Sequence, residues 1–365
     1  MRSKSALAAA CLAGVLLVLE GGLRLQAFFD ELRVEKGWKT IAAAARPSRG
    51  AVVSLEDVVR PSPDPKRIYE LLPDLDVTIV HRIVTNSAGF RGHEFAATKP
   101  PSTVRIVGLG DSVMFGLGLE ESETFLARLG PLLSARFPSV AWEVVNLAVP
   151  GYDTVNEVAT LEAKGLGYAP DLVILNFVAD DLGLPKFIVR RSQPLALDRS
   201  FLVARLAGLL HGPEGGSGTG LIASVRRRDG VRGAVLTDDV RAMAGFDAFA
   251  EAIANLKRLS EKHSFHILVV GHPRLPREVH ELVHGLGIAS VASEPVVTRY
   301  MRRNGIDDIR DPRLAFSAAD PHPTAIAHGL IAEAIATHLD EIGEAEALVN
   351  GATSEAGAPA TAPPP

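Results

Sequence analysis

The feature that most constrains the fold of this chain is a repeated alternation of short apolar runs with longer amphipathic segments between residues 103 and 339. The runs expected to form buried strands are Val104–Leu109, Trp142–Leu147, Leu172–Phe177, His266–Val270 and Ile288–Val291. The segments with helical spacing are Glu123–Phe137, Val155–Leu166, Phe246–His263 and Pro323–Leu339. Strands that alternate with helices of about 10–15 residues indicate βαβ units. We therefore expect an α/β fold with a doubly wound, flavodoxin-like parallel sheet of about five strands, covered by helices on both faces.

Polar residues follow several of the expected strands at their carboxyl ends, which is where doubly wound sheets bind ligands. Gly110-Asp111-Ser112 follows the first strand, Gly151 follows the second, and Asp180-Asp181 follows the third. Near the end of the chain, Asp320-Pro-His322-Pro precedes the last expected helix. Because parallel strands end at one edge of the sheet, these side chains are the candidates for a common site.

The glycine-rich turn at Gly110 matches none of the common nucleotide or hydrolase fingerprints. A dinucleotide fingerprint fails at Val113, a phosphate loop would need Gly-Lys-Ser/Thr, and a nucleophile elbow would need Gly where Met114 stands. What remains is a serine at a strand-to-helix turn, with an exposed hydroxyl and an unpaired N–H, as an acyl-transfer nucleophile requires. Such a serine needs a base and the base needs an orienting group, which His322 and Asp320 can supply.

These blocks, in this order, resemble the SGNH, or GDSL, hydrolases over roughly residues 86–339. The resemblance implies an esterase in which Ser112 is the nucleophile and His322 and Asp320 complete the triad. It also implies that the N–H groups of Ser112 and Gly151 form the oxyanion hole, that no cofactor or metal is used, and that lipids or O-acylated glycans are the substrates. Asn86-Ser-Ala-Gly-Phe-Arg-Gly looks like the corresponding stretch of a membrane-tethered bacterial subgroup.

One block departs from the family pattern, because Asp180 stands where the third block carries an oxyanion-binding Asn. An ionised carboxylate has no hydrogen to donate, and losing one oxyanion donor typically costs about 10²–10³ in turnover. Three interpretations are open. Asp180 is held protonated and donates, or Asn176 substitutes for it as the oxyanion donor, or the site is weakened and the chain is a glycan-binding module. The remaining N–H groups favour retained activity. Transfer of the same acyl group to a sugar hydroxyl, which would make the chain an O-acyltransferase, is a further alternative.

The N-terminus carries basic residues followed by the apolar run Ala6–Leu19, in the arrangement of a signal sequence. Extended through Leu25, the run approaches the roughly 20 residues that span a bilayer. We expect residues 1–27 to be an uncleaved signal anchor. A cleaved signal peptide and a buried helix of a cytosolic protein are the alternatives. With the family resemblance, an anchor places the domain at the bacterial inner membrane, facing the periplasm or the exterior.

The remaining domain boundaries follow from composition. Residues 28–102 are expected to be a membrane-proximal linker and N-terminal extension, and residues 103–343 the hydrolase domain. Within that domain, residues 184–236 contain nine basic and three acidic side chains and are expected to be an insertion that acts as a lid or is simply solvated. Residues 344–365 are rich in Ala, Gly, Thr and Pro and are expected to be a disordered tail.

Composition excludes several classes of function. With 38 Lys and Arg against 43 Asp and Glu, and only 5% aromatic residues, the chain is not expected to bind nucleic acid. A single cysteine, Cys11, excludes an internal disulfide and a cysteine-based metal cluster. His280-Glu281-Leu-Val-His284 matches a zinc-protease motif, but Ser290 stands where its extended form needs His, so an exposed amphipathic helix is favoured.

For two further residues, His328 and Arg91, a structural role competes with a role in the reaction. His328 is expected to be a packed helix residue rather than a second base, because His322 and Asp320 already fill that role. Arg91 is either a salt-bridge residue or a substrate contact, and the sequence does not separate these.

Overall fold

The structure is a computed structural model that describes residues 6–8, 10–26, 28, 47–190, 200–203, 206, 220–223 and 238–357. The chain divides into two compact units. The first consists of Met1–Ala45 with Lys186–Arg241, and the second of Arg46–Pro185 with Ala242–Pro365. The second unit contains the sheet and every residue that the sequence marks as a candidate for the site.

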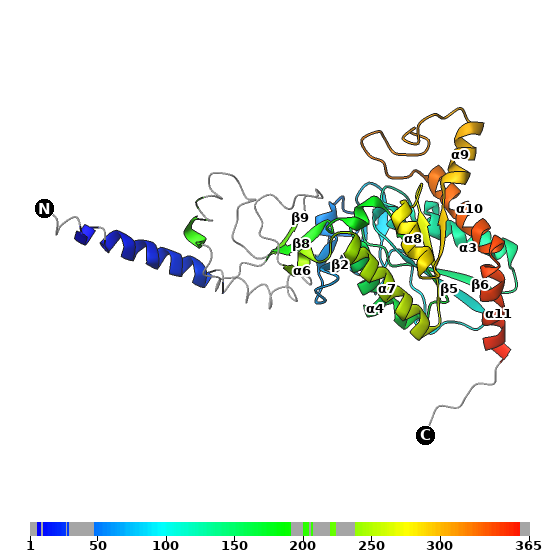
Figure 1. Cartoon of the computed structure of the whole chain (residues 1–365), viewed down its shortest axis with the longest axis horizontal. Coiled ribbons are helices and arrows are strands. Elements are labelled where there is room, and N and C mark those ends of the chain that lie inside the picture. The colour runs from blue at the N-terminus through cyan, green and yellow to red at the C-terminus, as the bar shows by residue number, and fades with distance from the viewer. Residues whose placement is uncertain are drawn as a thin grey trace, which may run out of the picture. The chain divides into compact units, whose positions relative to one another are not determined.

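The second unit is built on a parallel sheet of five strands in the order β11-β10-β7-β5-β6. The strands are β5 (Thr103–Leu109), β6 (Ala141–Asn146), β7 (Leu172–Phe177), β10 (His266–Gly271) and β11 (Ala289–Ala292). Ordered along the chain, this is the 2-1-3-4-5 arrangement of a doubly wound, flavodoxin-like fold, so the predicted fold class is confirmed. The apolar runs of β5 and β7 are buried throughout because helices cover both faces of the sheet (Figure 1).

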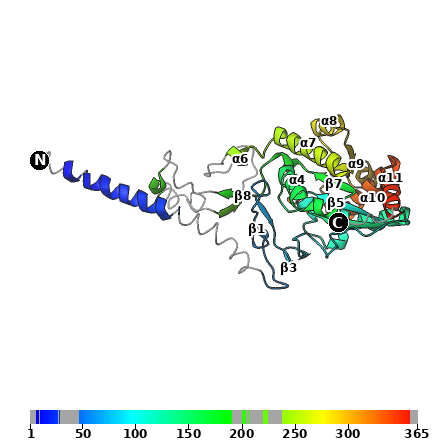
Figure 2. The same cartoon turned by 90° about the horizontal axis from the view of Figure 1, so that it is seen from below.

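The helices pack in pairs on the two faces of this sheet, as both views show (Figure 1, Figure 2). The pair α3 (Phe125–Arg136) and α10 (Ala325–Glu341) lies on one face, and the pair α4 (Thr154–Ala163) and α7 (Phe246–His263) on the other. Strand alternation sends Val107 and Leu109 into the core shared with α4 and α7. Gly108, between them, faces α3 so closely that a Cβ there would lie 2.4 Å from the Leu126 side chain.

The segment before the sheet is more ordered than a linker. Within residues 47–102, β1 (Val59–Pro61) pairs with β2 (Tyr69–Leu71), and β3 (Asp76–Thr78) pairs with β4 (Arg82–Val84). The Tyr69 hydroxyl donates to the Pro150 carbonyl at 3.1 Å. The described part of the predicted linker and N-terminal extension therefore contains short strands, and buried apolar side chains attach it to the sheet unit. Residues 29–46 lie outside the described residues.

The expectation of a disordered tail from residue 344 is corrected, because α11 occupies Glu344–Gly357. Its buried residues are Ala345, Leu348 and Ala352, which recur at helical spacing and form an apolar stripe. The many small and polar residues around that stripe dominate the composition and obscure it. The last eight residues, 358–365, lie outside the described part of the chain.

Another helix that sequence patterning did not predict, α9 (Glu294–Arg303), follows β11. Its side chain Val297 belongs to a small core with Ile306, Leu314 and Ala327. This core contacts α10 at its first turn, which lies directly after the predicted base.

The first unit contains the helix Ala6–Gln26, which has 21 residues. Of the helices in the described residues, it is the one that is long and apolar enough to cross a membrane, a property that signal sequences share. Of the predicted basic insertion, 184–236, the described residues are 184–190, 200–203, 206 and 220–223. They include an antiparallel pair of β8 (Phe187–Arg190) with β9 (Gly220–Ala223).

Candidate active site

Ser112 is placed at the carboxyl end of β5 by a single helical turn, α2 (Ser112–Phe115). Asp111 begins this turn: its Oδ1 accepts the Val113 N–H at 2.8 Å, and its Oδ2 lies 3.2 Å from the Ser112 Oγ. Glycine is required at Gly110, because a Cβ there would lie 2.3 Å from the Met114 Cβ. The turn holds Ser112 partly exposed at the edge of the sheet.

His322 and Asp320 reach Ser112 from the loop that precedes α10. The Nε2 of His322 lies 2.8 Å from the Ser112 Oγ, and its Nδ1 lies 2.5 Å from the Asp320 Oδ1. The Asp320 Oδ1 also accepts the His322 backbone N–H at 3.2 Å. A continuous hydrogen-bonded chain thus joins a hydroxyl, an imidazole and a carboxyl group across 210 residues of sequence.

The hydrogen-bonded groups Ser112, His322 and Asp320 are accessible to water. The Asp320 side chain is 52% exposed and the His322 side chain 28%. Partial burial raises the pKa of Asp320, but the hydrogen bonds from the His322 ring and backbone outweigh it, and the pKa lies below its ordinary value. Asp320 is therefore ionised at neutral pH, when it can accept the imidazole N–H.

Gly151, the second predicted oxyanion donor, lies in the loop after β6 with φ at +83°, a conformation that favours glycine. The loop is secured from the N-terminal segment by the bond from Tyr69 to Pro150 and by one from the Tyr152 hydroxyl to the Tyr69 carbonyl. Within the described part of the chain, the N–H groups of Ser112 and Gly151 donate no hydrogen bond. Both are thus available to an oxyanion.

Asp180, at the third predicted oxyanion position, lies in the single turn η4 (Ala179–Leu182) and is exposed. Asn176 is fully buried in β7, and its side-chain amide donates to the Val270 carbonyl at 3.2 Å. Its amide is therefore engaged inside the sheet, which argues against Asn176 as the substitute donor.

The structure also contains buried carboxyl groups that the sequence did not single out. Asp111, Asp153, Glu157 and Asp181 are each at most 2% exposed. Burial, followed by the charges of Asp111 and Asp153, raises the pKa of Glu157 well above its ordinary value. Burial, followed by the charge of Glu157, does the same for Asp181. No sequence signal marks Glu157, because its burial follows only from packing of α4 on the sheet.

The other histidine motifs form no part of this site. His280 and His284 lie on the exposed face of α8 (Arg277–Gly285), where Glu281 pairs with Arg277 at 2.7 Å, as expected of an exposed amphipathic helix. His328 is buried in α10, and its Nδ1 accepts the Phe125 N–H at 2.9 Å. Burial lowers the pKa of His328 to about 3, so it is neutral and packed, in line with its predicted role.

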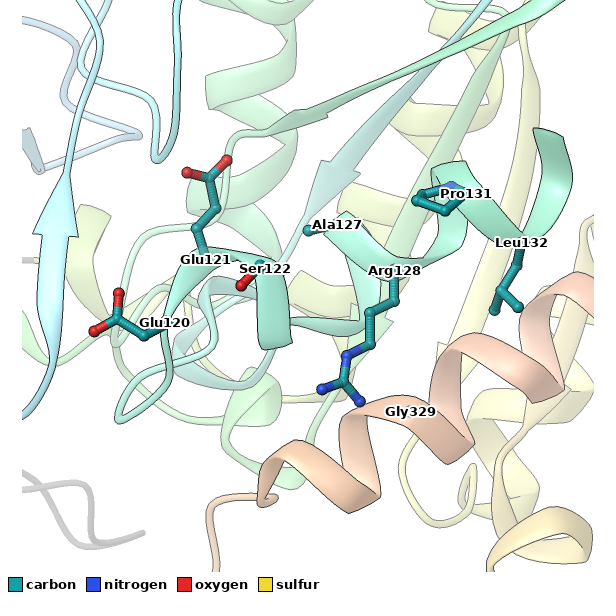
Figure 3. A pocket seen from close by; sticks show the side chains of 8 residues that line it. All are labelled: Glu120, Glu121, Ser122, Ala127, Arg128, Pro131, Leu132 and Gly329. Atoms are coloured by element: carbon teal, nitrogen blue, oxygen red, sulfur yellow. The ribbon is translucent and has the colours of Figure 1, made fainter. Parts of the chain in front are cut away.

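A surface cavity of about 760 Å³ lies elsewhere, between η2 (Glu121–Glu123), α3 and α10 (Figure 3). Arg128 extends from α3 toward α10 and donates to the Ala325 carbonyl at 2.7 Å. Two carboxylates, Glu120 and Glu121, also line this cavity. Ser112, Asp320 and His322 do not line it, so it is separate from the hydrogen-bonded chain.

No protein-family model and no curated protein matches the chain, whereas several solved structures do. The chain is similar to TesA, with 15% identity and a TM-score of 0.38 over 65% of this chain and 99% of that one. It is similar to a two-domain esterase (CEX) active on acetylated mannans, with 15% identity and a TM-score of 0.40 over 72% of this chain and 52% of that one. It is also similar to a catalytic mutant of Axe2, an acetylxylan esterase from Geobacillus stearothermophilus, with 15% identity and a TM-score of 0.39 over 67% and 97%.

Proposed function

We propose that the chain is a serine esterase of the SGNH type. The Ser112 Oγ attacks the ester carbonyl carbon while its proton passes to the His322 Nε2. The tetrahedral intermediate then expels the alcohol, which takes that proton, and leaves an acyl group on Ser112. Water, deprotonated by His322, attacks this acyl group and releases a carboxylic acid and the free serine. Asp320 holds the imidazole in the tautomer that these steps need.

The observation that carries this proposal is the hydrogen-bonded chain of Ser112, His322 and Asp320, with distances of 2.8 and 2.5 Å. A nucleophile in contact with a base that is itself oriented by a carboxylate is the arrangement that activates serine. In the proposal, the N–H groups of Ser112 and Gly151 stabilise the oxyanion, and Asp180 occupies the remaining position without donating. Two donors leave part of the usual stabilisation in place.

Hydrolysis is favoured over acyl transfer by the exposure of the site. An enzyme that passes an acyl group to a sugar hydroxyl must keep water away from the acyl-serine. The Asp320 side chain is half exposed and His322 is more than one quarter exposed, so water has access to the imidazole that would activate it. We accordingly assign water, rather than a sugar, as the acceptor.

The substrate class and location are part of the same proposal. The helix Ala6–Gln26 would tether the domain to the bacterial inner membrane, with the site facing the periplasm or the exterior. From there it would reach esters of lipids or O-acylated envelope glycans. The apolar length of that helix supports the tether.

The test is covalent labelling with a fluorophosphonate, which forms a stable adduct with an activated serine, followed by intact-mass measurement and peptide mapping. The wild type is expected to gain one adduct, on Ser112. Ser112→Ala should gain none, and His322→Ala should react at least about 100-fold more slowly because general-base catalysis is lost. Ser122→Ala, which removes another exposed serine, is the control and should label normally.

An unlabelled wild type that still binds glycans would refute the esterase and support a binding module. If the wild type is labelled, product analysis with an activated ester and an acceptor sugar distinguishes the two remaining functions. Free carboxylic acid is the expected product. An acylated sugar as the main product would show that the chain is an acyltransferase and not a hydrolase.

A further inference from the structure

Arg91 is a buried cation that the proposed reaction does not use. It lies in the stretch Asn86–Gly92 of the N-terminal segment and is only 3% exposed. Its Nη1 donates to the carbonyls of Phe115 and Gly116, the latter at 2.8 Å, and its Nη2 donates to the Leu119 carbonyl. Neither interpretation from sequence describes this arrangement, because the guanidinium binds backbone carbonyls rather than a carboxylate or a substrate.

The carbonyls of Phe115 and Gly116 belong to the end of the turn that presents the predicted nucleophile, and Leu119 lies in the loop that follows it. A helix of four residues has too few internal hydrogen bonds to be stable alone, and its last carbonyls lack helical partners. Arg91 supplies donors there, and its guanidinium lies 4.6 Å from the centre of the Phe115 ring. The Asn146 side chain donates to the Met114 carbonyl at 3.3 Å, and a backbone bridge links Asn146 to Arg91.

The clamped end of the turn is connected directly to the serine. The Ser112 carbonyl accepts the N–H of Gly116 at 3.1 Å and of Leu117 at 2.9 Å. The loop that follows the turn approaches the loop that carries His322. At Gly118, where φ is +86°, a Cβ would lie 2.5 Å from the Phe316 ring, and the Phe316 N–H donates to the His322 carbonyl at 3.1 Å.

The charge of Arg91 is retained despite its burial. Burial lowers the pKa of Arg91 to about 10, while the nearby carboxylates Glu121 and Glu120 act in the opposite direction. The guanidinium is therefore positive at neutral pH, the sign that stabilises the carboxyl end of a helix.

We propose that Arg91 is a positioning residue for the nucleophile: it clamps the end of α2 and so fixes the Ser112 Oγ against the His322 Nε2. The inference rests on the proposed esterase function, and it assigns a reaction-related role to the N-terminal segment. A lysine cannot reproduce the clamp, because one ammonium group cannot bind three carbonyls in the planar geometry of a guanidinium.

A matched control is present in the same unit. Arg105 is fully buried, donates to the carbonyls of Ala96, Ala97 and Tyr168, and pairs with Glu143. It lies in the first half of β5, whereas the serine follows the opposite end of that strand. Arg105→Met should thus destabilise the fold as Arg91→Met does, without disturbing the turn.

The experiment compares Arg91→Met, Arg91→Lys and Arg105→Met in the full chain, with kcat and KM for an activated ester expressed per serine titrated by fluorophosphonate. Arg91→Met is expected to lower kcat about 10- to 100-fold, because small displacements of reacting groups have effects of this size. Its KM should change less than about threefold, and Arg91→Lys should be intermediate. Arg105→Met should keep kcat per titrated serine within about threefold of the wild type, whatever its yield.

Equal loss in the Arg91 and Arg105 variants, or no loss in Arg91→Met, would overturn the inference. If Arg91→Met fails to fold, the kcat of Arg91→Lys is compared with that of Arg105→Met in the same way.

A second readout separates this inference from the esterase proposal: hydrogen exchange of a peptide covering residues 112–119. Exchange there should accelerate in the Arg91 variants and not in Arg105→Met, even if the wild type hydrolyses no ester. Unchanged exchange in all variants refutes the clamp.

Discussion

Replacing Asp320 by Asn tests how much the charge at the end of the hydrogen-bonded chain contributes. In the structure, the Asp320 Oδ1 accepts both the ring N–H and the backbone N–H of His322. A backbone N–H can only donate, so an Asn side chain is expected to turn its oxygen toward it. The same oxygen then accepts the ring N–H, and the imidazole keeps its tautomer. Asp320→Asn therefore removes the negative charge of the side chain and keeps its hydrogen bonds to His322.

The size of the effect follows from the difference between two kinds of hydrogen bond. A hydrogen bond to a charged group contributes about 1.5–3 kcal/mol, and one between neutral groups about 0.5–1.5 kcal/mol. A loss of about 1–2 kcal/mol corresponds to a roughly 5- to 30-fold lower kcat, at about 1.4 kcal/mol per factor of ten. The 52% exposure of the Asp320 side chain favours the lower half of this range, because water screens the charge.

The assay is hydrolysis of an activated acetyl ester at saturating substrate, expressed per titratable serine, with Ser112→Ala as the inactive reference. Ser317→Ala serves as the control for the loop, since its hydroxyl accepts the Asp320 N–H at 2.9 Å without touching the imidazole. A loss near 10⁴, as in a triad whose buried Asp fixes the tautomer, would show that the substituted amide turns its nitrogen toward the ring. An unchanged kcat would show that Asp320 does not act on His322.

Three further predictions concern other carboxyl and imidazole groups. Asp180→Asn should raise kcat on an activated ester by up to about 100-fold, because it supplies an oxyanion donor; a fall would give the carboxylate another role. Glu157→Gln should raise the free energy of unfolding at pH 7 by about 1–3 kcal/mol in urea titrations, because it removes an acid that is costly to ionise when buried. The gain should shrink as the pH falls toward 4.5, where the unfolded carboxyl also takes up a proton, and a pH-independent difference would contradict the reasoning. His328→Asn keeps an acceptor for the Phe125 N–H and removes a histidine whose pKa is lowered by burial. Between pH 6.5 and 3, the slope of the free energy of unfolding against pH should therefore decrease by up to about 1.4 kcal/mol per pH unit. An unchanged slope would place the acid sensitivity in other groups.

The sign of the His328 prediction follows from proton binding. In the unfolded chain the imidazole takes up a proton below pH 6.5, whereas in the folded chain burial delays this to about pH 3. The unfolded state therefore binds more protons in that interval, and stability falls as the pH falls. His272, whose pKa is lowered to about 4 by burial, adds to the same trend, so the substitution removes only part of it.

Local patterns in the sequence were sufficient to predict the sheet and most of its helices. Leu172–Phe177 and Phe246–His263 have the predicted bounds, because a buried strand and an amphipathic helix each have a period that neighbouring residues reveal. The helix α11 was not predicted, because small residues around its apolar stripe hide the helical period.

The sequence by itself determined the fold class and the chemical types at the candidate site, since strand periods, a Gly-Asp-Ser turn and an Asp-Pro-His turn are local features. Only the tertiary structure decided which of these groups meet. Packing of α10 on α3 brings His322 to Ser112 across 210 residues, and packing of the N-terminal segment buries Arg91 against the end of α2. Such contacts depend on long-range burial and on hydrogen bonds between distant backbone groups, which residue spacing along a chain does not encode.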